Sequence, residues 1–246
     1  MSLGGIDVDK FDQHVYNPNL LDNWYFVDPV NQRNVNSTIS AKGYFIDRWI
    51  LVEGSVEITK LGLVLNGTIQ QKFENSVDIE TKATVLTTEG LIDAEYDDTQ
   101  KVYQITASNQ TLIAAKLEVG DSQTLAYYDG EKYVLNDPIP NKSSELCKCL
   151  AYYVHEYNVQ FHTDDHINSL YYLCNVEFPV PMRATPTLTY RNSGTGNLYR
   201  VYTGSAVAAT IGLSVDRYRI RNGTRTSGTL TAGDILACIV NLSAEL

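Results

Sequence analysis

Turn-forming dipeptides recur along this chain, in several places eight to twelve residues apart, and the stretches between them are rich in Tyr, Val, Ile and Thr. These four residue types favour strands, whereas Gly, Asn and Asp favour tight turns. Short strands at regular spacing predict a β-sandwich or jelly roll. The dipeptides are Asn66-Gly67, Glu89-Gly90, Asp97-Asp98, Ser108-Asn109, Asp129-Gly130, Ser193-Gly194, Asn222-Gly223 and Ala232-Gly233.

Individual segments support this all-β prediction. Residues 55–59 alternate between polar and apolar side chains, which places Val56 and Ile58 on one face of a strand. Residues 102–107 and residues 112–117 are two further strand-like stretches. We therefore expect two tandem β-sandwich units of jelly-roll type, with one short helix at the start of the second.

The Asn222-Gly223 dipeptide follows the strand-like sequence of residues 218–221. Asn-Gly readily adopts the positive φ angles that a type I′ turn requires. The sequence therefore predicts a hairpin turn at this dipeptide.

One segment departs from the β pattern. Apolar residues recur there at steps of three and four, which is the spacing of an amphipathic helix. Ser143 or Ser144 is available as the N-cap. We predict a short helix over about residues 144–152, with its apolar stripe packed into a core.

Charge divides the chain near residue 140. Residues 1–140 contain 10 Lys and Arg against 21 Asp and Glu, which gives −11, whereas residues 141–246 contain 9 against 8, which gives +1. Two prolines at positions 138 and 140 exclude regular structure between the halves. The predicted organisation is an arm (1–16), a jelly-roll module (17–136), a linker (137–142) and a β-rich C-terminal domain (143–246).

Several partner classes are disfavoured by composition. An acidic N-terminal half offers no excess of cations for a phosphate backbone, so we expect no nucleic-acid partner. No run of about 18 apolar residues occurs, so we expect no membrane insertion. The N-terminus lacks the basic and apolar regions of a secretory signal.

Four separated segments carry a resemblance to a known class of proteins. Residues 19–26 (Asn-Leu-Leu-Asp-Asn-Trp-Tyr-Phe), with Asp-Arg-Trp at 47–49, resemble the opening of jelly-roll modules in bacteriophage tail-fibre and minor structural proteins, and of carbohydrate-binding modules. Leu-Glu-Val-Gly at 117–120 resembles the end of such a module. Residues 145–153 and 178–187 resemble segments that follow it in phage proteins.

The resemblance implies a non-catalytic adhesion or structural protein of a virion tail, made in the bacterial cytoplasm, that engages host-surface glycan and other tail proteins. Aromatic rings stack on the C–H faces of sugars, and amide, carboxylate or guanidinium groups bind sugar hydroxyls. Trp24 and Tyr25 are adjacent and must face opposite ways in an extended segment, so we expect one of the two to be exposed, whereas Trp49 follows an alternating strand with Phe45 and is expected in the core. Tyr127-Tyr128 and Tyr171-Tyr172 pose the same choice between core and surface. The stacking candidates are Trp24, Tyr25, Tyr44, Tyr96 and Tyr103, and the hydroxyl partners are Asp22, Asn23 and Arg48.

Metal sites have weaker signals. His162, Asp164 and His166 would share one face of a strand and offer ligands for a divalent ion. The carbohydrate-module resemblance also allows a structural calcium, for which Asn23, Asp28 and the acidic residues 93–98 offer oxygen ligands. We expect no other cofactor.

No nucleophile elbow, phosphate loop or dinucleotide fingerprint occurs, so we do not expect an enzyme. Two alternatives to the adhesion hypothesis remain: a purely structural oligomerisation protein of the tail, and an accessory carbohydrate-binding module of a secreted bacterial enzyme. A homo-oligomer, with a trimer as the favoured form, is expected to assemble through the nearly neutral C-terminal half.

Overall fold

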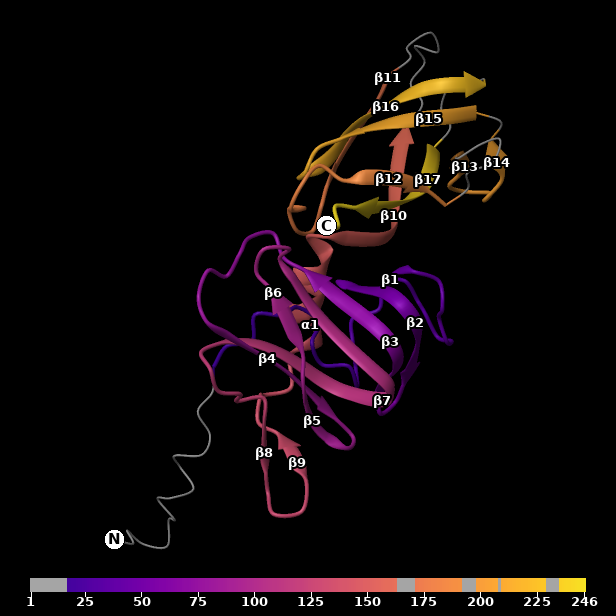
Figure 1. The fold of residues 1–246 in the computed structure, drawn as a ribbon. Helices are drawn as coiled ribbons and strands as arrows, with labels where there is room; N and C mark the ends of the chain where they lie inside the picture. Colours follow the sequence, from indigo (N-terminus) through magenta and orange to yellow (C-terminus); the bar gives the residue numbers. More distant parts are fainter. Residues whose placement is uncertain (1–16, 163–170, 192–197, 208, 229–234) are drawn as a thin grey trace, which may run out of the picture. The chain divides into compact units, whose positions relative to one another are not determined.

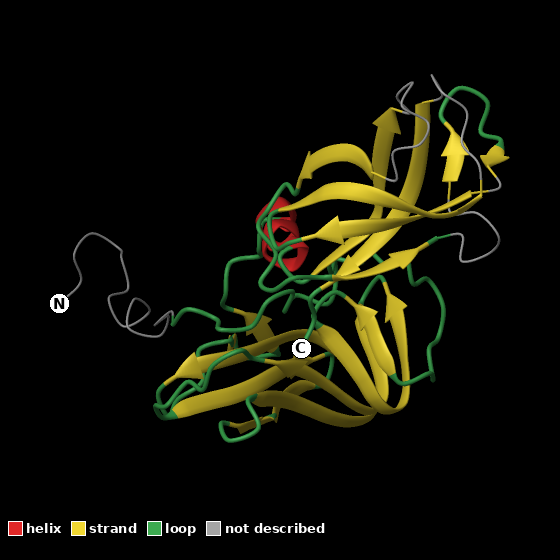
Figure 2. Cartoon of the chain, turned by 90° about the horizontal axis from the view of Figure 1, so that it is seen from above, coloured by secondary structure: helices red, strands yellow, loops and turns green. Residues whose placement is uncertain are grey.

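The computed structural model describes residues 17–162, 171–191, 198–207, 209–228 and 235–246. Figure 2 shows strands throughout the chain and one helix, the only one in these ranges. The chain divides into two compact units, one ending at Leu146 and one running from Cys147 to Glu245. The predicted all-β class with two units and one short helix is confirmed.

The first unit is built on one seven-stranded antiparallel sheet with the order β1-β2-β3-β7-β4-β5, in which β6 also pairs with β7 (Figure 1). A separate two-stranded hairpin, β8–β9, follows it. The strands are β1 (Gly43–Ile46), β2 (Trp49–Thr59), β3 (Gly62–Lys72), β4 (Thr81–Thr87), β5 (Gly90–Asp93), β6 (Glu95–Asp97), β7 (Val102–Val119), β8 (Ala126–Tyr128) and β9 (Tyr133–Leu135).

Strand β7 is the central element of this unit, and it merges the two strands predicted at 102–107 and 112–117. Its first half pairs with β3 and β6, and its second half pairs with β4. The ladder with β3 is irregular beside Asn109, which has a φ of 54°. Such a bulge bends a strand and increases its twist. β7 therefore pairs with strands in both parts of one curved sheet, and the two parts share one core.

The core of the first unit is aromatic and aliphatic. Trp49 is fully buried, as the alternation of its strand predicts, and its ring meets Phe26 at 5.1 Å between centroids. Val56 is also buried, and Ile58 of the same strand face packs against the core.

The second unit is a sandwich of two antiparallel sheets, with the orders β10-β17-β13-β14 and β11-β16-β15, and with β12 also on β17. Alternate residues of β17, including Cys238 and Val240, are buried in the core between the sheets. The strands are β10 (Tyr153–His162), β11 (Tyr171–Glu177), β12 (Thr187–Tyr190), β13 (Leu198–Arg200), β14 (Ala206–Val207), β15 (Ala209–Val215), β16 (Arg219–Gly228) and β17 (Ile235–Ser243).

The helix α1 spans Lys142–Leu150, close to its predicted position. Its N-cap is Asn141 and not Ser143 or Ser144, because the Asn141 side-chain oxygen accepts hydrogen bonds from the backbone N–H groups of both serines.

The predicted linker at 137–142 is wrong. Asp137 is buried within the first unit, and Lys142 already begins α1. Glu145 is also buried, and its carboxylate accepts a 2.7 Å hydrogen bond from the backbone N–H of Asn23. These polar contacts attach the proline segment and the first turn of α1 to the first unit, so the division falls inside the helix, after Leu146.

The turns predicted at two Asn-Gly dipeptides are also wrong. Asn222-Gly223 lies inside β16, between β11 and β15, and the preceding turn is formed around Asp216 instead. Asn66-Gly67 lies inside β3. Gly67 directly opposes Gly54 of β2, and the two strands approach closely there.

This close approach yields a stability prediction. A Cβ at Gly67 would lie 2.1 Å from the carbonyl oxygen of Glu53, and the φ of Gly67 is +145°. We expect Gly67→Ala to lower the free energy of unfolding by about 2 kcal/mol or more, measured by urea denaturation. Gly43→Ala is the control, since Gly43 also has a positive φ of +131° but a Cβ added there would meet no described atom within 4 Å. If both variants lost the same free energy of unfolding, backbone strain and not the close approach of the two strands would be the main cause.

Candidate functional site

Two of the predicted stacking residues belong to the core. Tyr103 is fully buried, its ring lies 6.0 Å from that of Trp49, and its hydroxyl donates a 2.9 Å hydrogen bond to the Thr84 carbonyl. Burial raises the pKa of the Tyr103 hydroxyl well above its ordinary value. Trp24 is only 6% exposed. The prediction that these rings stack on a ligand is corrected, because neither presents a face to solvent.

Asn23 and Arg48 are likewise interior, at 2% exposure each. The Asn23 amide donates to the carbonyls of Val30 and Asp47, at 2.9 and 2.8 Å, and accepts from the Val30 N–H at 2.7 Å. Its φ of 52° is left-handed, a conformation that Asn tolerates better than most residues. Asn23 thus anchors the loop before β1, and this replaces its predicted role as a hydroxyl partner.

Asp22 and Arg48 form an ion pair. The Arg48 Nε lies 3.2 Å from the Asp22 carboxylate, and a second guanidinium nitrogen donates to the Lys72 carbonyl at 2.8 Å. A buried guanidinium needs such partners, since an unpaired charge in the interior is costly. Arg48 therefore acts as a structural tie, and Asp22, although partly exposed, is its counter-ion.

Tyr44 and Tyr96 are partly exposed, and each has a protein partner. The Arg33 guanidinium lies 5.3 Å from the centre of the Tyr44 ring, in a cation–π contact. Tyr96 packs edge-on against Phe73, and its hydroxyl donates to Asp98 at 3.0 Å. Burial, together with the neighbouring Asp98 carboxylate, raises the pKa of Tyr96 to about 12.

Tyr25 is the predicted residue that lines a groove. Its segment pairs with the second half of β7, through Leu20 N–H to the Leu117 carbonyl at 2.8 Å and Phe26 N–H to the Ile113 carbonyl at 2.9 Å. Successive side chains of an extended segment face opposite ways, so burial of the Trp24 ring turns Tyr25 outward. The expectation that one of this adjacent pair is exposed is confirmed in part, since Tyr25 is half-buried.

The β8–β9 hairpin brings two further tyrosines to this groove. Tyr128 and Tyr133 are direct partners across the hairpin, and their rings meet edge to face at 5.4 Å. Their exposed fractions are 58% and 41%. The sequence left Tyr128 as an open choice between core and surface but missed Tyr133, which the Asp129-Gly130 turn between them could have signalled.

A groove of about 650 Å³ lies between the hairpin and the sheet, and its apolar lining includes Tyr25, Tyr128 and Tyr133. We call it the tyrosine groove. Its polar lining comes from the β4–β5 turn and from the hairpin turn: Thr87, Thr88, Glu89, Glu131 and Lys132. Aromatic faces beside hydroxyl, carboxylate and ammonium groups suit a ligand with both C–H faces and hydroxyls.

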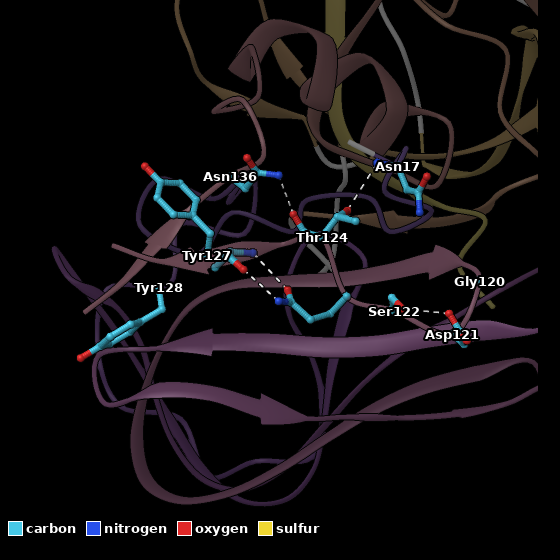
Figure 3. Close-up of a pocket in the computed structure, with 10 residues that line it drawn as sticks. Asn17, Gly120, Asp121, Ser122, Thr124, Tyr127, Tyr128 and Asn136 are labelled. Atoms are coloured by element: carbon cyan, nitrogen blue, oxygen red, sulfur yellow. Dashed lines mark hydrogen bonds between the residues drawn. The ribbon is translucent and has the colours of Figure 1, made fainter. Parts of the chain in front are cut away.

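A second hollow of about 470 Å³ also borders Tyr128 (Figure 3). It is lined mainly by polar residues of the loop after β7, including Asp121 and Ser122. Its Thr124 is held by the backbone N–H of Asn17, at 3.3 Å, and by the side-chain amide of Asn136, at 2.9 Å. Many of its polar groups are bonded to one another, so the tyrosine groove is the stronger candidate for a ligand.

The histidine metal site stays a prediction, because its residues lie almost entirely outside the part of the chain that the structure describes. Asp164 and His166, and the side chain of His162, lie outside the described residues. Of the calcium candidates, Asp28 pairs with Lys142 and Asp98 accepts from the Val77 N–H at 2.7 Å. Among the residues that the structure describes, no group of three or more His, Cys, Asp or Glu side chains is arranged to hold a metal ion.

The structural role of Asn23 can be tested directly. We expect Asn23→Ala to lower the free energy of unfolding by about 3 kcal/mol, because three buried backbone groups lose their partner. Asn31→Ala is the matched control, since the side chain of Asn31 bonds to nearby Val35 in a partly exposed loop. Chemical denaturation followed by Trp fluorescence measures both, and a loss in Asn23→Ala no larger than in Asn31→Ala would contradict the anchoring role.

Comparison of the chain with protein-family models, with curated proteins and with solved structures returned no match. Within the described residues, no helix is long and apolar enough to cross a membrane. The function is therefore inferred from the geometry of the first unit and from the four segments that resemble phage tail proteins.

Proposed function

We propose that this chain is a non-catalytic adhesion protein of a bacteriophage tail, whose first unit binds host-surface carbohydrate in the tyrosine groove. The observation that carries the proposal is the set of partly exposed rings of Tyr25, Tyr128 and Tyr133 along one groove with a polar border. The resemblance of four ordered segments to phage tail proteins supports the biological setting, in which the protein resides on the virion.

The chemistry of the groove indicates the kind of sugar. The groove lining includes two acids, Glu89 and Glu131, and one cation, Lys132, and residues 1–140 carry a net charge of −11. A negatively charged surface repels polyanions such as teichoic acid. We therefore propose a neutral or amino-sugar polymer as the ligand, bound with a dissociation constant of about 0.1–1 mM per site. Several copies on one particle would raise the avidity far above that of one site.

A glycan array followed by calorimetric titration tests this proposal. We expect Tyr128→Ala and Tyr133→Ala each to weaken binding about fivefold or more, because each loses about 1 kcal/mol of ring burial. Leu61→Ala is the control, since Leu61 is 69% exposed on the same unit and is not among the residues that line the groove. Absence of binding, selectivity for polyanions, or equal affinity of all variants would count against the groove.

An alternative proposal is a structural role in oligomer formation. The second unit exposes Tyr202 and Tyr218, at 83% and 56%, and residues 141–246 are close to neutral overall. Interfaces between copies favour Tyr and Arg and avoid a high density of like charge. Exposed tyrosines on a nearly neutral unit therefore favour a virion protein over an accessory carbohydrate-binding module.

Light scattering of the full chain tests the oligomer. We expect a trimer at micromolar concentration, and we expect Tyr202→Glu and Tyr218→Glu to shift it toward the monomer by adding desolvated charge to the contact. Glu substitution of exposed Leu61 in the first unit is the control. A monomeric wild-type protein would remove the oligomerisation proposal and leave the glycan proposal standing.

A further inference from the structure

A buried amine and a buried carboxylate meet in the first unit, outside the tyrosine groove. Lys116 lies in β7, and Asp137 follows β9 at a sequence separation of 21 residues. The Lys116 side chain is 0% exposed and that of Asp137 is 1% exposed. The Lys116 Nζ donates to the Asp137 Oδ1 at 2.6 Å, so an amine and a carboxyl carbon are held within reach of each other.

A second acid completes the cluster. Glu118 lies two residues after Lys116 on the same strand, with its carboxylate 0% exposed and its Oε2 3.6 Å from the Lys116 Nζ. The Glu118 oxygens accept from the backbone N–H of Thr124 at 2.7 Å and from its hydroxyl at 2.5 Å. These bonds fix Glu118 beside the amine, and the Thr124 hydroxyl also accepts from Lys116 at 2.8 Å.

The environment of Asp137 favours the uncharged acid that a condensation needs. The Asp137 Oδ2 is buried and has no hydrogen-bond partner. Burial raises the pKa of the Asp137 carboxyl, and the Glu118 charge raises it further, although the contact with Lys116 opposes both effects. A buried ion pair loses hydration that its mutual attraction only partly restores. Transfer of one proton from the ammonium to the carboxylate would remove both charges.

We propose that Lys116 and Asp137 condense to an intramolecular isopeptide bond, with Glu118 as the proton carrier. The neutral Lys116 Nζ attacks the Asp137 Cγ to form a tetrahedral centre. Glu118 takes a proton from the nitrogen and returns it to one hydroxyl of that centre, which leaves as water. A new C–N bond replaces one C–O bond, the ammonium and carboxylate charges disappear together, and no oxidant or other reactant is needed.

Geometry supplies the driving force. Groups that a fold holds at near-attack distance, about 3–3.5 Å, react as though at very high effective concentration. The water released goes to bulk solvent, and the closed interior keeps water from hydrolysing the product. Leu117 and Leu125, both 0% exposed, lie in the same segment and help to exclude solvent.

The bond would have a mechanical consequence. It would close a ring from Lys116 to Asp137 that contains the whole β8–β9 hairpin, and with it Tyr128 and Tyr133. A covalent cross-link restricts the unfolded chain and stabilises the fold. The hairpin would therefore stay attached to β7 under load, whether or not the tyrosine groove binds sugar.

Mass spectrometry of the purified full-length protein tests the proposal. The expected intact mass is lower than the sequence mass by one water. Trypsin does not cut after an acylated lysine, so digestion should give residues 102–132 joined through Lys116 to residues 133–142. Recovery of the linear peptide 102–116 from folded protein at its sequence mass would overturn the proposal.

Three variants test which two side chains form the bond and which one carries the proton. Lys116→Arg keeps the positive charge but cannot condense, so it should keep its full mass. Glu118→Gln cannot accept the proton and should remain largely uncross-linked, whereas complete cross-linking would refute the role of Glu118. Asp137→Asn should form the same amide by releasing ammonia, and its product should have the mass of the cross-linked wild type. Should Lys116→Arg or Glu118→Gln fail to fold, the branched peptide from the wild type and from Asp137→Asn decides the question alone.

Discussion

The first unit depends on the pairing of β7 with segments on both of its edges. This strand of 18 residues pairs with β3 and β6 in its first half and with β4 in its second half. The segment around Tyr25 adds backbone hydrogen bonds to the second half. Because unpaired backbone groups in the interior are costly, this shared ladder fixes which side chains enter the core and which face outward.

Buried polar groups then fix the irregular parts of the chain. Asn23 ties the long loop before β1 to that strand's end, and Glu145 caps the backbone of the same segment from α1. Lys116 likewise holds the stretch after β9, through its hydrogen bond to Asp137. Each group bonds to at least one partner more than 20 residues away in sequence, which explains why the residues that resemble a binding motif serve instead to hold the loops.

The tyrosine groove follows from these ties. The hairpin packs where Asp137 and Asn136 anchor its second strand, and this placement brings Tyr128 and Tyr133 beside Tyr25. The rigid ladder thus supports a short hairpin whose aromatic side chains are only partly covered. The proposed sugar binding depends on this exposed aromatic cluster and its fixed support.

The sequence by itself determined the all-β class, the helix near residue 145, the burial of Trp49 and the opposite facing of Trp24 and Tyr25, because these follow from local periodicity and turn chemistry. The turn predictions at Asn66-Gly67 and Asn222-Gly223 failed, because strand pairing overrides the local preference for a turn there. Only the tertiary structure decided that Asn23, Arg48 and Tyr103 are interior, that Tyr133 joins Tyr25, and that Lys116 meets Asp137. Those outcomes depend on contacts between residues far apart in the chain, and no local pattern encodes such contacts.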